Sequence, residues 1–313
     1  MANATEKSLL SRFVGLTFWN ILSNITVPLA GLVDTAMLGH LDDLRYLSGV
    51  ALGAVLFTYV YWTFGFLRMG ATGQTAQAVG RRDRVEQYAI LYRFLALAFG
   101  IALVILLVQV PVAELGFWLL SGEEAVKQAG RDYYFARIQG APAAFGSMVL
   151  LGWFLGREQS RVVLAMTLVA NVVNIGLNYL FILRWDWAAA GAGYATAISQ
   201  YAMLAVGVVF LLAQGSPARV ASAELWNRDR VQGVLRLNFD IMIRTFSLVT
   251  AFALMTGYSA VLGGLTLAAN AVLLRLLETA AYLIDGAAFA AESLGGIYRG
   301  ERDLAALRRL ERT

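Results

Sequence analysis

Residues 88–112 read YAILYRFLALAFGIALVILLVQVPV, an apolar run of 25 residues in which Arg93 is the single charged side chain. About 20 apolar residues are enough for a helix to cross the hydrocarbon core of a bilayer. The same composition extends over the whole chain of 313 residues, of which 59% are hydrophobic and only 15% charged. Because soluble domains carry about 25% charged residues, these proportions indicate a membrane protein.

Eight segments of this kind are long enough to span a membrane, and none has the alternating pattern of a membrane β-strand. We therefore predict an all-α integral membrane protein with about eight transmembrane helices. Their expected bounds are Phe13–Val33, Leu47–Met69, Tyr88–Val112, Tyr134–Leu155, Val162–Leu183, Ala188–Leu212, Leu237–Leu262 and Leu265–Ala291. The stretch 214–236, with Pro217 and mixed charge, predicts a cytoplasmic linker, and 299–313 predicts an amphipathic helix.

The basic residues indicate how these spans are oriented. With the N-terminus in the cytoplasm, sixteen Arg and Lys residues fall in inner segments and four in outer loops. Such an excess follows the positive-inside rule and predicts a multi-pass protein with a cytoplasmic N-terminus. The net charge of +4 then reflects loop orientation, so we expect no nucleic-acid partner.

The composition also argues against an enzyme. The chain has no Cys and one His, His40, which excludes thiolate nucleophiles and leaves too few groups for a Cys- or His-ligated metal site. No phosphate-binding P-loop is present, so ATP is not the expected energy source. We expect no catalytic residue, no resident metal and no cofactor.

An internal repeat joins two distant parts of the chain. Residues 47–83 align without a gap to residues 267–303, with seven identities in 37 positions. Both copies end in the pattern Gly-x-Arg-Asp, at Gly80 and at Gly300. Transporters are often built from such repeats. A complete second copy of the first six spans would require about 120 residues beyond Thr313.

Ionisable side chains inside spans cost at least about 2.5–3.5 kcal/mol each on insertion scales, which makes them functional candidates. Asp34 follows Pro28 in the first span and is either a cation-binding carboxylate in a cavity or an interfacial acid. The fifth span places Thr167, Asn171, Asn174 and Asn178 on one face, within about 60°. These residues either line a hydrated pocket that faces Asp34 or join neighbouring helices.

The eighth span carries a second polar stripe within an arc of about 100°. Its members are Arg275, Glu278, Tyr282, Asp285 and Glu292. Arg275 and Glu278 are three residues apart and are expected to pair. A polar stripe of this kind is expected to face either a cavity, here a possible cavity of the C-terminal lobe, or the partner bundle of helices. In the seventh span we expect a local ion pair between Asp240 and Arg244.

Several of these motifs resemble one transporter family. The run 28–41, PLAGLVDTAMLGHL, resembles the first span of multidrug and toxic compound extrusion (MATE) transporters of the DinF-like branch. Residues 174–182, NIGLNYLFI, resemble the fifth span of that branch, and 191–196, GAGYAT, the start of its sixth. Residues 268–270, AAN, and 278–292, ETAAYLIDGAAFAAE, resemble its eighth span.

The resemblance implies an antiporter of twelve helices in two six-helix lobes. It would export organic cations or amphipathic drugs by alternating access while protons or Na⁺ flow inward across a bacterial inner (plasma) membrane. The resemblance assigns cation coupling to Asp34, Asn174, Asn178 and Thr196. Many family members have Asp where Asn178 stands, and one carboxylate fewer favours protons over Na⁺.

The resemblance also divides the chain. It implies an N-lobe at residues 1–213, a linker at 214–236 and an incomplete C-lobe at 237–313. We expect a C-terminally truncated member of the family that is monomeric at full length and whose partners are the lipid bilayer and a small-molecule substrate. Two alternatives remain open: an inactive fragment, or a lipid-linked saccharide flippase of the same superfamily. A flippase needs a cationic cavity, for which Arg68, Arg93 and Arg137 are candidates.

Overall fold

The computed structural model describes residues 2–41, 43–215, 218, 220–221, 225 and 228–312, and all regular secondary structure in these ranges is helical. The helices are α1 (Ala2–Gly39), α2 (Leu44–Thr63), α3 (Phe66–Gly80), α4 (Arg84–Leu107), α5 (Gln109–Leu119), α6 (Glu124–Ile138), α7 (Ala141–Gly156), α8 (Ser160–Asn178), the π-helix η1 (Tyr179–Arg184), α9 (Ala188–Ala213), α11 (Arg228–Val261), α12 (Gly264–Glu301) and α13 (Leu304–Leu310). The predicted all-α membrane class is confirmed.

In the described part of the chain, five helical segments are long and apolar enough to cross a membrane. They are Leu9–Gly39, Arg84–Leu107, Ser160–Arg184, Ala188–Ala213 and Phe239–Thr256. The pair α6 and α7 passes the same test as one span with a 55° bend. The two other predicted spans, 47–69 and 265–291, fall on α2 with α3 and on α12.

Three of the predicted spans are not single helices as expected. The span 134–155 breaks between α6 and α7, where Pro142 stands in the first turn of α7 and lacks the N–H that would bond back into α6. Pro111 likewise cannot donate to Leu107, where α4 ends, and α5 follows. The span 47–69 breaks between α2 and α3 at residues 64–65. Hydropathy registers apolar length, so it misses such local backbone breaks.

The predicted linker 214–236 is also shorter than expected at its C-terminal end. Helix α11 begins at Arg228, so residues 228–236 are helical. Arg, Gln and Leu favour helix formation, and a helix can extend past the apolar segment that marks the membrane. Linker residues 216–217, 219, 222–224 and 226–227 lie outside the described residues.

The internal repeat is visible in the contact between α3 and α12. A Cβ atom at Gly80 would overlap the carbonyl oxygen of Ile297, and one at Gly300 would overlap that of Gln77. Gln77 and Ile297 are separated along the chain by the same interval as Gly80 and Gly300. The reciprocal contacts therefore relate the two helices by a local two-fold axis.

The helix ends beyond this contact match as well. Arg82 and Arg302 both have left-handed backbones, with φ of 56° and 61°. The next residue in each copy caps the following helix: Asp83 accepts from the Glu86 N–H at 2.9 Å, and Asp303 from the Ala306 N–H at 2.8 Å. The repeated Gly-x-Arg-Asp pattern thus encodes the same helix–turn–helix corner twice.

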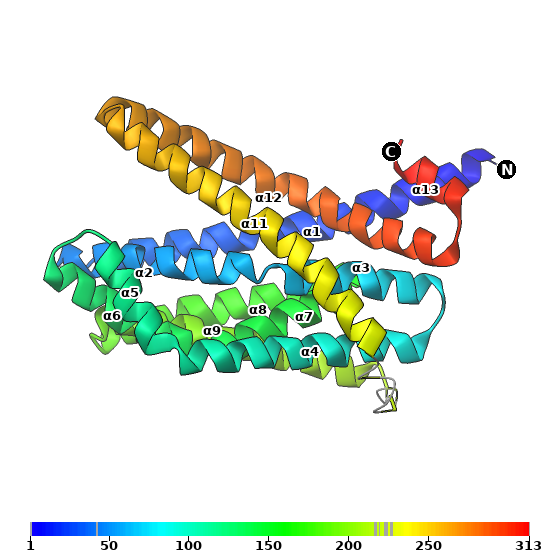
Figure 1. Ribbon diagram of the computed structural model, residues 1–313, viewed down its shortest axis with the longest axis horizontal. Helices are drawn as coiled ribbons and strands as arrows, with labels where there is room; N and C mark the ends of the chain where they lie inside the picture. Colours follow the sequence, from blue (N-terminus) through cyan, green and yellow to red (C-terminus); the bar gives the residue numbers. More distant parts are fainter. Residues whose placement is uncertain are drawn as a thin grey trace.

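Figure 1 shows how the C-terminal helices meet the rest of the molecule. Helices α11 and α12 run side by side, cross the other helices near α3, and diverge from α2 toward the turn that joins them (Figure 1). At the other end of α12, α13 lies beside the N-terminal part of α1. There Leu307 and Leu310 pack against a small core that includes Leu16 and Leu294.

Candidate cation-coupling cavity

Helix α1 carries Asp34 and contacts α8 on the N-terminal side of this residue. Pro28 stands inside α1 and has no N–H, so the carbonyl of Asn24 lacks its usual helical partner. The hydroxyls of Ser23 and Thr167 lie 2.9 Å apart and join α1 to α8. Thr167 therefore acts as a helix–helix contact, one of the two roles that the polar face of the fifth span allowed.

The other role fits the end of the same face. The amide nitrogen of Asn178 donates to Oδ1 of Asp34 at 2.5 Å and also faces Oδ1 of Asn174 at 3.2 Å. Asn174 lies within reach of α9, where its nitrogen is 3.4 Å from the hydroxyl of Thr196. Asn178 is fully buried. The structure thus brings together Asp34, Asn174, Asn178 and Thr196, while their role in coupling remains a prediction.

Three of these side chains, Asp34, Asn174 and Thr196, border a cavity of about 430 Å³, which falls within the range of about 300–1,000 Å³ typical of small-molecule sites. Its polar wall comes from α1, α6, α8 and α9, and its apolar wall mainly from α2. The polar lining residues are Asp34, Thr35, Tyr133, Arg137, Asn171, Asn174, Thr196, Ser199 and Gln200. Among the described lining residues, Asp34 and Arg137 are the charged ones.

The oxygen and nitrogen of the Asn174 carboxamide can be assigned in two ways from the hydrogen bonds around them. In one, its oxygen accepts from Asn178 and its nitrogen donates to Thr196. In the other, the nitrogen stands 2.9 Å from Oδ1 of Asp34 and donates to it. An ionised Asp34 needs a donor at this position, whereas a protonated carboxyl can donate to the amide oxygen. The assignment with the nitrogen toward Asp34 supplies the donor that an ionised carboxylate needs.

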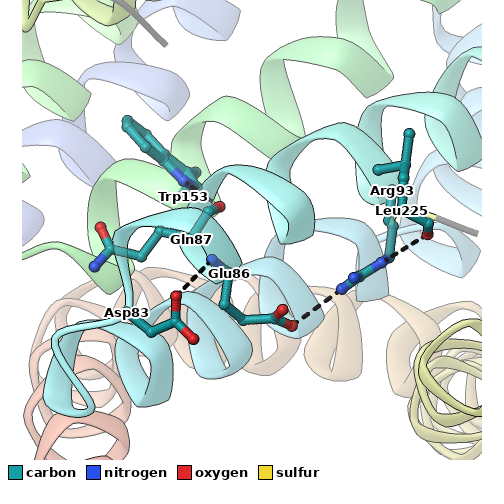
Figure 2. Close-up of polar contacts among 6 residues, drawn as sticks. All are labelled: Asp83, Glu86, Gln87, Arg93, Trp153 and Leu225. Carbon is teal, nitrogen blue, oxygen red and sulfur yellow. Dashed lines mark hydrogen bonds and ion pairs between the residues drawn. The ribbon is translucent and has the colours of Figure 1, made fainter. Parts of the chain in front are cut away.

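The three basic candidates from the sequence occupy different places. Arg93 is buried on α4, where it donates to Glu86 at 3.1 Å and to the carbonyl of Leu225 at 2.9 Å (Figure 2). Arg68 lies on α3 with its guanidinium 4.0 Å from the ring centre of Phe289 on α12. Of the three, Arg137 lines the cavity of Asp34.

Figure 2 also shows why this part of α4 is firmly placed. Asp83 caps the helix through the Glu86 N–H, and the indole nitrogen of Trp153 on α7 donates to the carbonyl of Gln87 at 3.0 Å. Trp153 is fully buried. Arg93 thus belongs to a structural network that joins α4, α7 and the linker.

The second polar stripe lies apart from this cavity, at the contact of α12 with α1 and α3. The carbonyl of Tyr282 accepts from Asn24 on α1 at 3.2 Å, and Asp285 is exposed. Glu292 is partly buried, with Oε1 3.9 Å from a Cβ position at Gly73 of α3. The side chains of Arg275 and Glu278 lie outside the described residues.

The expected ion pair between Asp240 and Arg244 is not among the ion pairs of the described residues. A guanidinium nitrogen of Arg244 instead lies 3.8 Å from the sulfur of Met69 on α3. Local spacing made the pair available, but the tertiary packing of α11 on α3 directs Arg244 away from its own helix.

From the sequence, Arg137 was expected only as one of three candidates for the cationic cavity of a flippase, and Tyr133, Ser199 and Gln200 were not expected at the site of Asp34. Helix α6 reaches the cavity because Gly193 lies against the backbone of Tyr133 and tolerates no side chain there. The small residues of the run 191–196 were the available signal for this close packing of α6 on α9.

The repeated helical architecture defines a multi-pass membrane protein, and a cavity with polar and apolar walls lies between its helices. The family model described as MatE matches residues 20–180. The chain belongs to the MatE family, whose motifs its first, fifth, sixth and eighth spans resemble.

Individual relatives agree with this assignment. The chain is 39% identical over 287 residues to the DNA damage-inducible protein F of Escherichia coli, and the alignment covers 90% of this chain and 62% of that relative. It is 25% identical over 292 residues to the "Probable multidrug resistance protein NorM" of Acinetobacter baylyi, covering 90% of this chain and 64% of that relative. The chain thus spans less than two thirds of the length of these relatives.

Solved structures share the fold. One, titled "Outward-facing conformation of a multidrug resistance MATE family transporter of the MOP superfamily", matches with a TM-score of 0.86 and 21% identity over 96% of this chain and 67% of that one. A second, a MOP superfamily transporter from Pyrococcus furiosus whose title reports a reverse polarity of its binding pocket, matches with a TM-score of 0.86 and 19% identity over the same shares.

Proposed function

We propose that the protein containing this chain exports small molecules in exchange for protons and that Asp34 is the group that binds the coupling proton. The observation that carries this proposal is the setting of Asp34: it is the one acid among the described residues that line the cavity, and the amides of Asn178 and Asn174 contact its carboxyl. Such a site can hold the carboxyl in either protonation state.

Helix α1 connects the proposed proton site to α12 in the C-lobe. Asp34 contacts α8, while Asn20 and Asn24, further along α1, donate to the carbonyls of Gly286 and Tyr282 on α12 at 3.3 and 3.2 Å. We infer that protonation changes how α1 sits between α8 and α12. Alternating access would then follow from movement of the C-lobe relative to the N-lobe.

The substrate class rests on the relatives and on charge. The NorM relative is named a probable multidrug resistance protein. We propose organic cations or other xenobiotics as the substrates of this protein. Tyr282, Asp285 and Glu292 on α12 are the candidates for contact with a cationic substrate. The protein would act in a bacterial inner membrane with its N-terminus in the cytoplasm, as the positive-inside pattern predicts.

A flippase for lipid-linked saccharides has weaker support. Pyrophosphate would need a cavity with an excess of positive charge, because each buried anion must be compensated. Arg93 is engaged with Glu86 and Arg68 lies on α3. Arg137 and Asp34 line the same cavity, so a positive and a negative side chain offset each other in its net charge.

The test is Asp34→Asn in the full-length protein, reconstituted in liposomes with an imposed pH gradient. We expect export of ethidium to fall to the background rate, because the amide cannot bind a proton at neutral pH. Asp132→Asn is the matched control, since Asp132 is an exposed acid on α6 outside the cavity. Normal pH-driven export by folded Asp34→Asn protein would refute the proposed role of Asp34.

A further inference from the structure

The side chain of Arg137 is held in place by aromatic rings. It stands in the last turn of α6, with its guanidinium carbon 4.3 Å from the ring centre of Phe57 and 5.7 Å from that of Tyr61, both on α2. One guanidinium nitrogen donates to the Tyr133 hydroxyl at 2.5 Å. Rings that face a guanidinium stabilise its positive charge, so the cavity contains a fixed cation.

Within the described part of the chain, Arg137 forms no ion pair. The ion pairs between described residues are made by Arg12, Arg45, Arg93 and Arg131. The Nε atom of Arg137 is buried without a hydrogen-bond partner among the described residues. Asp34, on α1, lines the same cavity as Arg137.

The oxygen atoms around Asp34 could otherwise suit a metal cation. Hard cations take carboxylate, carbonyl and hydroxyl oxygens as ligands, and Asp34, Asn174 and Thr196 offer these atoms in one cluster. What the cavity lacks is net negative charge, because the neutral amide of Asn178 faces Asp34 and Arg137 supplies a positive charge. A proton binds covalently to one oxygen and needs no such shell of ligands.

We propose that Arg137 is the residue that makes this cavity select protons over Na⁺: its tethered guanidinium provides the positive charge that a metal cation would otherwise bring to Asp34. The inference rests on the proposed role of Asp34 as the coupling group. Because Arg137 is attached to α6, its effective concentration in the cavity is high and does not depend on the salt outside. Na⁺ must displace this charge from beside Asp34, whereas a proton does not.

The experiment measures binding of ²²Na⁺ to the purified full-length protein, separately from transport. Wild-type protein and Arg137→Lys should show no saturable binding that depends on Asp34, since lysine keeps the positive charge. Arg137→Gln should introduce weak binding. The double variant Arg137→Gln/Asn178→Asp, which restores two carboxylates without the guanidinium, should bind Na⁺ at least about tenfold more tightly than Arg137→Gln alone.

Adding Asp34→Asn to the double variant should abolish this binding, which locates the ion at the cavity. Monodisperse elution in size-exclusion chromatography identifies the folded variants, and Arg137→Gln alone decides the question if the double variant does not fold. A folded variant without the guanidinium that binds no more Na⁺ than wild type would overturn the proposal. So would wild-type binding that requires Asp34.

The proposed function is tested independently by pH-driven ethidium export in wild type and in Asp34→Asn. If that export does not depend on Asp34, the proton site is wrong. If it does depend on Asp34 but removal of Arg137 does not admit Na⁺, the role of Arg137 alone is wrong.

Discussion

The contact between α3 and α12 and the cavity beside Asp34 solve opposite problems with opposite residues. At the contact, Gly80 and Gly300 bring two helix backbones together with no room for a side chain. In the cavity, amides and hydroxyls surround a volume of about 430 Å³. Close packing of small residues stabilises helix pairs in membranes, whereas polar groups around a cavity are costly unless they bind something. The first region is a close helix contact, and the second is the region that we propose as a binding site.

A disulfide across the contact between α3 and α12 should have the largest effect on transport. A Cβ at Gly296 lies 2.5 Å from the Cβ of Ala76, so Ala76→Cys/Gly296→Cys should cross-link after small shifts that bring the pair to about 3.8 Å. The chain contains no other Cys to interfere. If α3 and α12 separate during the cycle, oxidation should stop ethidium export and a reductant should restore it.

The two single Cys variants, treated with the same oxidant, are the controls. Full export by protein that is completely cross-linked on a gel would mean that the α3–α12 contact stays closed throughout transport. The glycines would then serve stability alone.

Adding a side chain at the contact between α3 and α12 should have the next largest effect, which is on stability. Gly80→Leu must displace the Ile297 backbone, and we expect a loss of about 3 kcal/mol in the free energy of unfolding, or roughly 5–10 °C in Tm. Ala51→Leu on the cavity wall is the matched change, and it should cost little because there is space in front of it. Thermal unfolding followed by tryptophan fluorescence measures both.

Equal losses for Gly80→Leu and Ala51→Leu would show that the cavity wall is as tightly packed as the contact. In that case the α3–α12 contact and the cavity wall would not differ in how tightly they are packed.

Removing one cap of the repeated corner should have the smallest effect. Asp83→Ala removes the side-chain acceptor for the Glu86 N–H, and such N-caps contribute about 1 kcal/mol. Asp83 joins two long helices, whereas its counterpart Asp303 begins the seven-residue helix α13. We therefore expect Asp83→Ala to lower Tm and Asp303→Ala to change it less. The reverse order would mean that α13 is a main contributor to stability.

The sequence predicted much of the fold and part of the site. Continuous apolar runs such as 88–112 require helices, since a backbone in lipid must satisfy its own hydrogen bonds. The spacing of Asn174 and Asn178 placed them on one helix face, and the family resemblance associated them with Asp34. The spacing could not reveal that Thr167, on that same face, bonds to Ser23, because spacing alone does not identify the partner helix.

Other outcomes depended on contacts between distant segments. Arg244 was expected to pair with Asp240 but lies near Met69, because the packing of α11 on α3 outweighs a local pair. Arg137 was one of three similar intramembrane arginines until the bend between α6 and α7 placed it in the cavity. Periodicity describes a helix one face at a time, and it carries no information about a second helix that approaches that face.

The sequence by itself therefore determined the membrane class, the helical segments, the repeated Gly-x-Arg-Asp corner and the identities of the polar residues that must find partners. Those properties follow from local backbone chemistry and from the cost of leaving polar groups in lipid. The tertiary structure alone decided which of those polar residues share a cavity and which side chain faces Asp34. Such pairings depend on how helices cross, and crossing geometry is set by side-chain packing along the entire length of both helices.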